Sequence, residues 1–145
     1  PNDILSANKK IAGILIENVV KHNKLDYSII GIGLNVNQTD FENLAKATSL
    51  KKCCAKTFDL DEILLKFLVI LKDSFKRLET NAFEALKADY EFKLFRKDKP
   101  STFKNAEGLL VSGFIKGISS TGNLVILLED QIIEEYSLKE ITLLY

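Results

Sequence analysis

The sequence has 145 residues, with no methionine or tryptophan, one histidine and two cysteines. Because His22 stands alone, histidine metal clusters and histidine-dependent triads are hard to build, and we expect His22 to be a surface residue. Cys53 and Cys54 are adjacent, and neighbouring cysteines rarely form a disulfide. No histidine or further cysteine lies near them to complete a zinc set, so we predict reduced thiols that are structurally incidental.

An excess of charge of either sign is also missing, since twenty basic and twenty acidic residues cancel. Without a basic excess, broad contact with nucleic acid is not expected. No apolar run approaches the length that spans a membrane, and no secretory signal opens the chain, so we expect a cytoplasmic protein without a membrane partner. Because the chain starts abruptly at Pro1 and has no methionine, we expect a fragment of a larger protein.

The segment 28–37 alternates between bulky apolar side chains and side chains that are small or polar. The first set is Ile30, Ile32, Leu34 and Val36, and the second is Gly31, Gly33, Asn35 and Asn37. This alternation predicts a strand with one buried face. Because two glycines leave the other face bare, we interpret it as the floor of a small-molecule site. The alternative is an ordinary strand with a glycine bulge and an exit turn.

Two shorter segments before this strand are also expected to be strands. Residues 4–5 end one, and residues 11–17 form another that is rich in β-branched side chains, so the three make an antiparallel meander. His22 falls in a polar hairpin turn. After the central strand we predict a short helix over residues 40–46 and a loop over residues 49–58.

Two amphipathic helices follow. Asp59 with Glu62, and Asn81 with Glu84, stand three residues apart as in a capping box. The apolar stripes recur at three- and four-residue steps, and they consist of Ile63, Phe67, Leu71, Phe75 and Leu78 in the first helix and Phe83, Leu86, Tyr90 and Leu94 in the second. We interpret both stripes as core that packs on a sheet.

The sequence pattern changes from long amphipathic segments to short apolar segments after a charged connector at residues 95–101. Short apolar segments separated by turn residues predict strands and a small barrel. They are residues 109–118, 124–128, 132–136 and 141–144. The expected fold class is therefore α+β, with a sheet packed by helices over residues 1–95 and a small barrel over residues 96–145.

Three motifs in order resemble the biotin–protein ligases, the bacterial biotin–[acetyl-CoA-carboxylase] ligases. They are Pro-Asn-Asp at residues 1–3, Lys-Ile-Ala-Gly-Ile-Leu at residues 10–15 and Gly-Ile-Gly-Leu-Asn at residues 31–35. The seven-residue step from Asp3 to Lys10 matches the family's spacing. The resemblance covers the whole chain. It implies part of a class II synthetase-like catalytic domain with a mixed or antiparallel sheet, followed by a barrel of the Src-homology-3-like type.

The resemblance implies a ligase that forms biotinyl-5′-AMP from biotin and ATP, then transfers biotin to a lysine of the biotin carboxyl carrier protein of acetyl-CoA carboxylase. It implies catalysis by Lys10, biotin contacts from Lys10, Gly13, Ile14, Leu15, Gly31 and Gly33, nucleotide contacts from Asn2, Leu34 and Asn35, and a magnesium ion positioned by Asp3. The alternative is a non-enzymatic ligand-binding or carrier-docking module of a biotin-responsive regulator. A homodimer is also expected, through strand edges that a missing half would cover.

The sequence also departs from the family. The family's Gly-Arg-Gly-Arg loop and the Lys-Trp pair that precedes Pro-Asn-Asp are absent, and Leu144 stands where some members carry an arginine. These 145 residues alone are therefore expected to be inactive.

Overall fold

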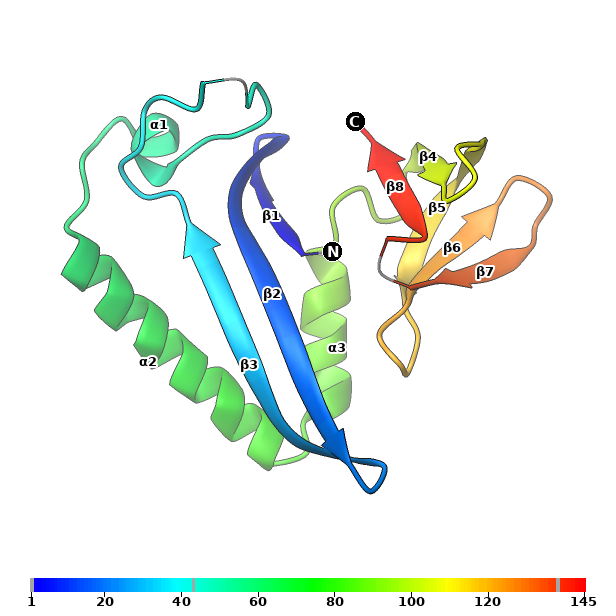
Figure 1. Cartoon of the computed structure of the whole chain (residues 1–145), viewed down its shortest axis with the longest axis horizontal. Coiled ribbons are helices and arrows are strands. Elements are labelled where there is room, and N and C mark those ends of the chain that lie inside the picture. The colour runs from blue at the N-terminus through cyan, green and yellow to red at the C-terminus, as the bar shows by residue number, and fades with distance from the viewer. Residues whose placement is uncertain (1, 43, 138) are drawn as a thin grey trace. The chain divides into compact units, whose positions relative to one another are not determined.

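The computed structural model describes residues 2–42, 44–137 and 139–145. The chain divides into two compact units, Pro1–Lys72 and Asp73–Tyr145. Each unit contains one antiparallel sheet, as Figure 1 shows, so the predicted α+β class is confirmed. In the described part of the chain, no helix is both long enough and apolar enough to cross a membrane.

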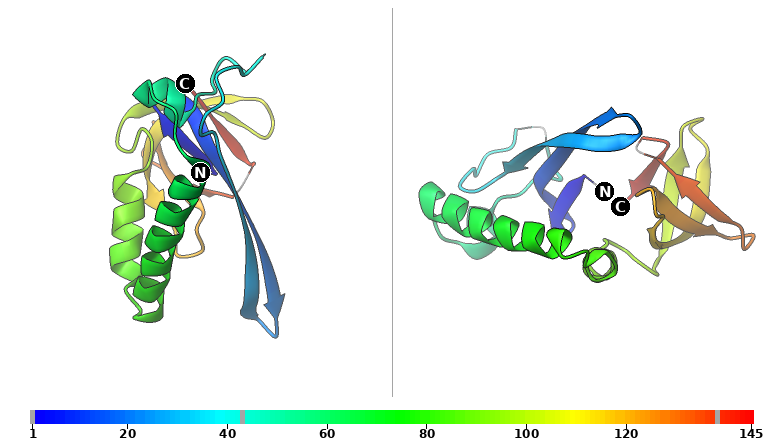
Figure 2. Two further views of the ribbon diagram at one scale, coloured as in Figure 1. Left: turned by 90° about the vertical axis from the view of Figure 1, so that its left-hand side faces the viewer. Right: turned by 90° about the horizontal axis from the view of Figure 1, so that it is seen from below.

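The first unit holds three strands, β1 (Asp3–Ser6), β2 (Lys9–Lys21) and β3 (Lys24–Leu34), in the order β1-β2-β3. Figure 2 shows β2 and β3 as a long twisted hairpin. Its turn is formed by His22 and Asn23, with φ of 50° and 59°. Two consecutive positive φ angles are typical of a two-residue type I′ turn. The predicted meander and the exposed position of His22 are confirmed.

The prediction that the central strand buries one face is wrong for the described residues. Ile30, Ile32 and Leu34 share a side of β3 and are 37–41% exposed. A sheet buries a face only when a second layer packs on it. Every residue of β3 is exposed, which shows that the described residues supply no layer that covers either face of this strand fully.

The segment after β3 differs from both predictions made for it. Residues 40–46 form turns in their described part, and the Asp40 carboxylate accepts the Glu42 N–H at 2.9 Å, a local bond that competes with helix. Asn43 in this predicted helix lies outside the described residues, as Pro1 of the first motif does. Within the predicted loop lies helix α1 (Leu50–Cys54), which Ser49 caps by accepting the Lys52 N–H at 3.2 Å. Five residues are too few to show helical periodicity.

The two long helices are α2 (Leu60–Glu79) and α3 (Phe83–Phe92). The Asp59 cap is confirmed, since its carboxylate accepts the Glu62 N–H at 2.9 Å. The Asn81 cap is wrong, because α3 begins after Ala82 without a side-chain cap. Asn81 instead takes a positive φ of 57° just after α2, where the left-handed conformation ends helices.

The interpretation of the helix stripes as core is wrong for most of the described residues, although Leu94 of the second stripe packs against the buried cluster of Phe103, Ile115 and Ile126. Neither α2 nor α3 contains a buried side chain. Three members of the first stripe, Ile63, Phe67 and Leu71, are half-buried, while Phe75 and Leu78 are exposed. Periodicity reports which side of a helix is apolar, but burial also requires a partner surface.

The second unit holds a five-stranded sheet in the order β7-β6-β5-β4-β8. Its strands are β4 (Pro100–Asn105), β5 (Leu110–Ile118), β6 (Leu124–Leu128), β7 (Ile133–Tyr136) and β8 (Ile141–Leu144). They surround a core of Phe103, Ile115 and Ile126. All but β4 were predicted. That strand was missed because alternate Ser101 and Phe103 both point inward, and a buried serine gives no apolar signal.

The division of the chain into two compact units falls within α2, between Lys72 and Asp73. Helix α3 groups with the second sheet because Glu91 accepts the Ile118 N–H at 3.0 Å. The assignment of residues 1–95 and 96–145 to two homologous domains stays a prediction.

Candidate functional site

A row of cross-strand partners runs over the first sheet. Asp3 pairs with Gly13, and Gly13 pairs with Gly33. Directly opposed residues of antiparallel strands share a face, and residues two positions along a strand return to it. Leu15 and its partner Gly31 therefore lie on the same face. We call this surface, made by Asp3, Gly13, Leu15, Gly31 and Gly33, the glycine face.

Lys10 reaches the glycine face because β2 carries a bulge. In a regular strand Lys10 and Gly13 would point to opposite sides. Ile4 pairs with Ala12 and Leu5 with Lys10, so Ile11 is an extra residue, and a bulge re-aims the neighbouring side chain. As a result, Lys10 Nζ lies 2.7 Å from Asp3 Oδ1. A Cβ added at Gly13 would meet Lys10 Cε at 3.5 Å.

The packing of the described residues does not require glycine on this face. A Cβ added at Gly33 would have no atom within 4 Å, and one at Gly31 would make an ordinary contact of 3.7 Å with the Leu15 carbonyl oxygen. No left-handed φ occurs at these positions. Glycine in a strand is destabilising by about 0.5–1 kcal/mol relative to alanine. A bare backbone retained at that cost suits a ligand that lies against the strand.

Two predicted site residues point to the other side of the sheet. Ile14 pairs with Ile32, and Leu34 pairs with Ala12, so their side chains leave the glycine face. Their main chains alone remain near it, and the Ile14 N–H already donates to the Asn2 carbonyl oxygen at 2.8 Å. Contacts of Ile14, Leu34 and Asn2 with a ligand stay predictions.

Asn35 follows β3 directly and forms three hydrogen bonds, one through its side chain and two through its main chain. Its side-chain Nδ2 donates to the Thr48 carbonyl oxygen at 3.0 Å, and its own N–H donates to the Ile11 carbonyl oxygen at 2.9 Å. Its carbonyl oxygen accepts the Leu50 N–H at 3.0 Å. These bonds match the alternative of a turn-forming asparagine. The predicted nucleotide contact stays a prediction.

Asp3 was predicted to position magnesium. Its carboxylate instead has the Lys10 ammonium as a partner, and both side chains are nearly half exposed. Across residues 2–42, 44–137 and 139–145, no group of three histidine, cysteine or acidic side chains could hold a metal ion. The role of Asp3 as a magnesium ligand stays a prediction.

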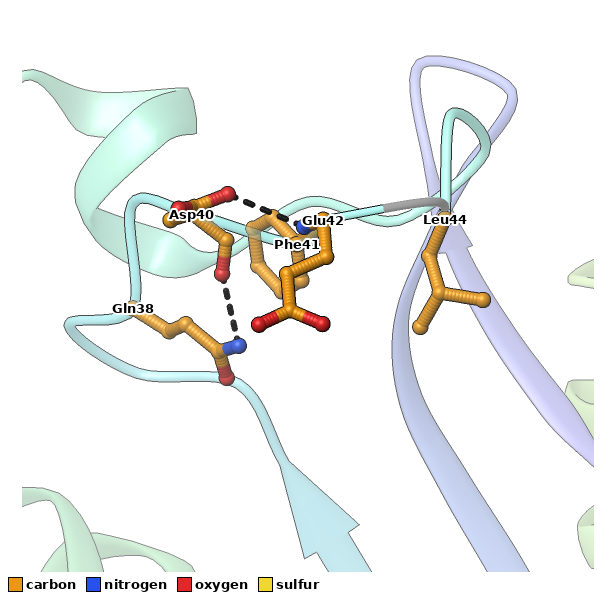
Figure 3. A pocket seen from close by; sticks show the side chains of 5 residues that line it. All are labelled: Gln38, Asp40, Phe41, Glu42 and Leu44. Carbon is orange, nitrogen blue, oxygen red and sulfur yellow. Dashed lines mark hydrogen bonds between the residues drawn. The ribbon is translucent and has the colours of Figure 1, made fainter.

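A hollow of about 320 Å³ lies in the segment after β3, lined by Gln38, Asp40, Phe41, Glu42 and Leu44. Figure 3 shows that its polar groups bond to one another. Gln38 donates to the Asp40 carbonyl oxygen at 2.7 Å, and Asp40 accepts from the Glu42 main chain. The lining includes neither Lys10 nor the glycines, so it is separate from the glycine face.

Cys53 lies beside two hydroxyl groups, those of Ser6 and Thr48, and the sequence did not indicate this arrangement. Both cysteines are free, as predicted, and both are exposed. Cys53 Sγ lies 3.5 Å from Ser6 Oγ and 3.6 Å from Thr48 Oγ1. The hydrogen bonds that Cys53 forms with Ser6 and then with Thr48 lower the pKa of its thiol from the ordinary value, and the nearby charge of Lys9 adds to this.

The sequence and the structure were both compared with those of known proteins. No family model matches the sequence. Bifunctional ligase/repressor BirA proteins from Bacillus subtilis and Bacillus spizizenii are each 35% identical to it over 95 residues, 63% of the chain. The apo structure of the biotin protein ligase from Aquifex aeolicus is 31% identical and covers 99% of the chain with a TM-score of 0.77. The same enzyme in complex with biotin and ATP gives 30% and 0.76.

The chain is a homologue of the biotin protein ligases. The resemblance inferred from the motifs is thereby confirmed. The chain spans 29% of each Bacillus protein and 62% of the apo Aquifex ligase chain.

Proposed function

We propose that these residues supply part of the site in which a biotin protein ligase joins biotin to AMP and then transfers biotin to a carrier-protein lysine. The single observation that carries the proposal is the glycine face, where the main chain is accessible to a ligand and the Lys10 ammonium group lies close to Gly13. The ligase names of the Bacillus relatives and the biotin–ATP complex of the Aquifex enzyme support it.

In the first step, an oxygen of the biotin carboxylate attacks the α-phosphorus of ATP, and pyrophosphate leaves. Two anionic groups must approach, so fixed positive charge lowers the barrier by offsetting their repulsion. The Lys10 ammonium is a compact charge that suits this role. Its ion pair with Asp3 holds it over Gly13 before substrate arrives. Lys10 need not transfer a proton in this step.

In the second step, the amine of the carrier lysine attacks the carbonyl carbon of the mixed anhydride, AMP leaves, and an amide bond forms. The glycine face would support the adenylate meanwhile, because Gly13 and Gly33 let a flat ring approach the main chain. The carrier we propose is the biotin carboxyl carrier protein of acetyl-CoA carboxylase. Since ATP is a substrate, the proposal includes a cytoplasmic location.

The second candidate is a non-enzymatic biotin-responsive regulator module. It is favoured by the word repressor in the names of the Bacillus relatives. This candidate binds biotin or docks a carrier but forms no adenylate.

The test is biotin-dependent release of pyrophosphate from ATP by the complete protein that carries these residues, with octanoate replacing biotin as the control acid. Mass spectrometry of the added carrier domain follows the second step. We expect pyrophosphate release when biotin is present but not when octanoate replaces it, and we expect one carrier lysine to gain the mass of a biotinyl group. Binding of biotin without either product would favour the regulator module. A polypeptide of residues 1–145 by itself should release no pyrophosphate, because it lacks the arginine loop.

A further inference from the structure

The segment between β3 and α2 gathers positive charge around helix α1. Residues 44–58 contain four lysines and no aspartate or glutamate. Lys51 and Lys52 lie in α1, and Lys56 follows it. Lys9 on β2 is close enough for its charge to act on Cys53 of the same helix. We call the surface made by Lys9, Lys51, Lys52 and Lys56 the lysine patch.

The ammonium groups of the lysine patch are not neutralised by carboxylates. In the described part of the chain, none of its lysines belongs to an ion pair, whereas lysines elsewhere do, namely Lys10, Lys21, Lys66, Lys87, Lys97 and Lys116.

Two lysines of the patch contact aromatic rings instead. Lys52 Nζ donates to the Thr39 carbonyl oxygen at 3.3 Å and lies 5.6 Å from the centre of the Phe41 ring. Lys56 Nζ lies 4.8 Å from the centre of the Phe58 ring. An aromatic face attracts an ammonium group without cancelling its net charge. These contacts restrict the two lysines while their positive charge remains available to a partner.

The lysine patch borders the candidate site. The Lys10 N–H donates to the Lys46 carbonyl oxygen at 2.7 Å, and the Thr48 N–H donates to the Lys10 carbonyl oxygen at 2.8 Å. Helix α1 begins two residues after Thr48, at the end of the sheet where β3 ends and β2 begins (Figure 1). A macromolecule that delivers a group to the neighbourhood of Lys10 would therefore pass close to the patch.

We propose that the lysine patch docks an acidic surface of the carrier protein while biotin is transferred. This inference rests on the proposed function, because the second step requires a folded carrier to present its lysine beside Lys10. Exposed charges raise the rate of association more than the affinity, and salt screens them. Such docking suits a protein substrate that must leave after each transfer.

A nucleic acid fits this surface less well than an acidic protein does. Binding to a phosphate backbone calls for an extended basic surface, whereas this chain has no net charge. The patch consists of lysines alone, and lysine presents a compact charge without the planar fork with which arginine binds phosphate. Binding of DNA is therefore an outcome that the experiment must distinguish.

Three triple variants of the complete protein separate charge at the patch from charge in general. The first neutralises the patch and is Lys51→Gln/Lys52→Gln/Lys56→Gln. The second keeps the charge and replaces the same three lysines by arginine. The control removes as much charge from α2 and from the residue after α3, and it is Lys72→Gln/Lys76→Gln/Lys93→Gln. Thermal melts check folding, and Lys51→Gln/Lys56→Gln serves if the first variant does not fold.

The assay measures kcat/KM for the biotin carboxyl carrier domain of acetyl-CoA carboxylase at low and at high salt. At low salt we expect the neutralised variant to lose roughly tenfold in kcat/KM, mainly through a raised KM for the carrier, because steering by opposite charge is lost. High salt should shrink this difference, since it screens exposed charges. The arginine variant and the control should resemble the wild type, and the KM for ATP should stay unchanged in all variants. An unaltered kcat/KM in the neutralised variant, an equal loss in the control, or a raised KM for ATP would overturn the proposal.

Cross-linking with a carbodiimide separates this proposal from the proposed function, because it does not depend on adenylate formation. The reagent joins a carboxylate to an amine that already touches it, and mass spectrometry locates the amide. We expect carrier carboxylates to be joined to lysines of the patch and not to Lys72 or Lys76. Cross-links that avoid the patch, or a neutralised variant that loses binding to duplex DNA but still docks the carrier, would overturn the proposal in an active ligase. If the protein forms no adenylate and the patch is cross-linked, the proposed function fails and the docking surface stands.

Discussion

At the scale of single residues, Gly33 is the one whose identity the packing explains least. A side chain added there would meet nothing within 4 Å, whereas one added at Gly113 would lie 2.6 Å from the Leu127 carbonyl oxygen and 2.9 Å from the buried Ile126 side chain. The two glycines therefore have different causes. Gly113 is needed by the fold, and Gly33 is available for a ligand.

Gly33→Val should leave the thermal stability of the complete protein unchanged or slightly raised, because valine favours strands. It should abolish biotin binding, since the new side chain stands on the glycine face. Gly113→Ala should do the reverse, costing about 1–3 kcal/mol of stability by overpacking while sparing affinity in the folded fraction. Calorimetric biotin titrations with thermal melts measure both. Unimpaired binding by a folded Gly33→Val variant would contradict the glycine face as a ligand site.

Cys53 should be alkylated by iodoacetamide faster than its neighbour Cys54. The Ser6 hydroxyl is the largest cause of the lowered pKa of the Cys53 thiol, so more thiolate is present at a given pH and reaction persists at lower pH. Ser6→Ala should slow the modification of Cys53. Mass spectrometry of Cys54→Ser and Cys53→Ser variants across roughly pH 6–9, a range that brackets the ordinary pKa of a thiol, gives each rate separately. Equal rates for the two thiols would argue against this environment.

At the scale of secondary-structure elements, strand β7 brings together two ionisable side chains, Tyr136 and Glu134, and their contact shifts the pKa of the tyrosine. The Tyr136 hydroxyl donates to the Glu134 carboxylate, its neighbour two positions along the strand. This hydrogen bond favours the protonated tyrosine, and together with partial burial and the negative charge of Glu134 it raises the pKa of Tyr136 from 10.0 to about 12.

The sign of the effect on stability follows from that raised pKa. The folded state holds the Tyr136 proton more tightly, so the contribution is complete below pH 10.0 and is lost as the pH rises towards about 12. Glu134→Gln should lower the pKa of Tyr136 and weaken the loss of stability in this window. Glu135→Gln, on the next position, is the control. Ultraviolet titration of the tyrosines, with urea unfolding at each pH, measures both, and identical curves for the two variants would refute the pairing.

Elements also show how far the sequence could predict this structure. Period-two alternation located β3, and short apolar segments between turn residues located β6 and β8, because both patterns are local; the Asp59 cap of α2 was visible for the same reason. Helix α1 was not visible, because Ser49 is held by Gln38 eleven residues away. The site residues were found by motif. The bulge that brings Lys10 beside Gly13 depends on pairing between strands, which alternation alone does not encode.

At the scale of the whole molecule, the first sheet is incompletely covered in the described residues. Apolar side chains such as Leu15, Ile29 and Ile30 are 41–57% exposed, and β1 and β3 are sheet edges. Exposed edges and apolar patches favour association.

We therefore predict that a polypeptide of residues 1–145 self-associates through strand pairing at micromolar concentration. Sedimentation velocity measures the species present. Lys substitutions at Ile29 and Ile30, near the middle of the β3 edge, should shift it towards monomer. Sedimentation as a monomer at all concentrations would contradict this expectation, and the homodimer would then lose its physical basis.

The most direct test of the account is single-turnover adenylate formation by the complete protein with Lys10→Ala, Lys10→Arg and Lys9→Ala. If Lys10 offsets the charge of the reacting groups, its alanine variant should lose about 2.7–4 kcal/mol of transition-state stabilisation, roughly a hundred- to a thousandfold in rate, with little change in melting temperature. The arginine variant should fall between, since it keeps charge but not compact geometry. Lys9→Ala should cost little, because adjacent residues of a strand point to opposite faces and Lys9 pairs with Ser6 while Lys10 pairs with Leu5. Equal losses at Lys9 and Lys10, or a Lys10→Ala defect explained entirely by unfolding, would contradict the account.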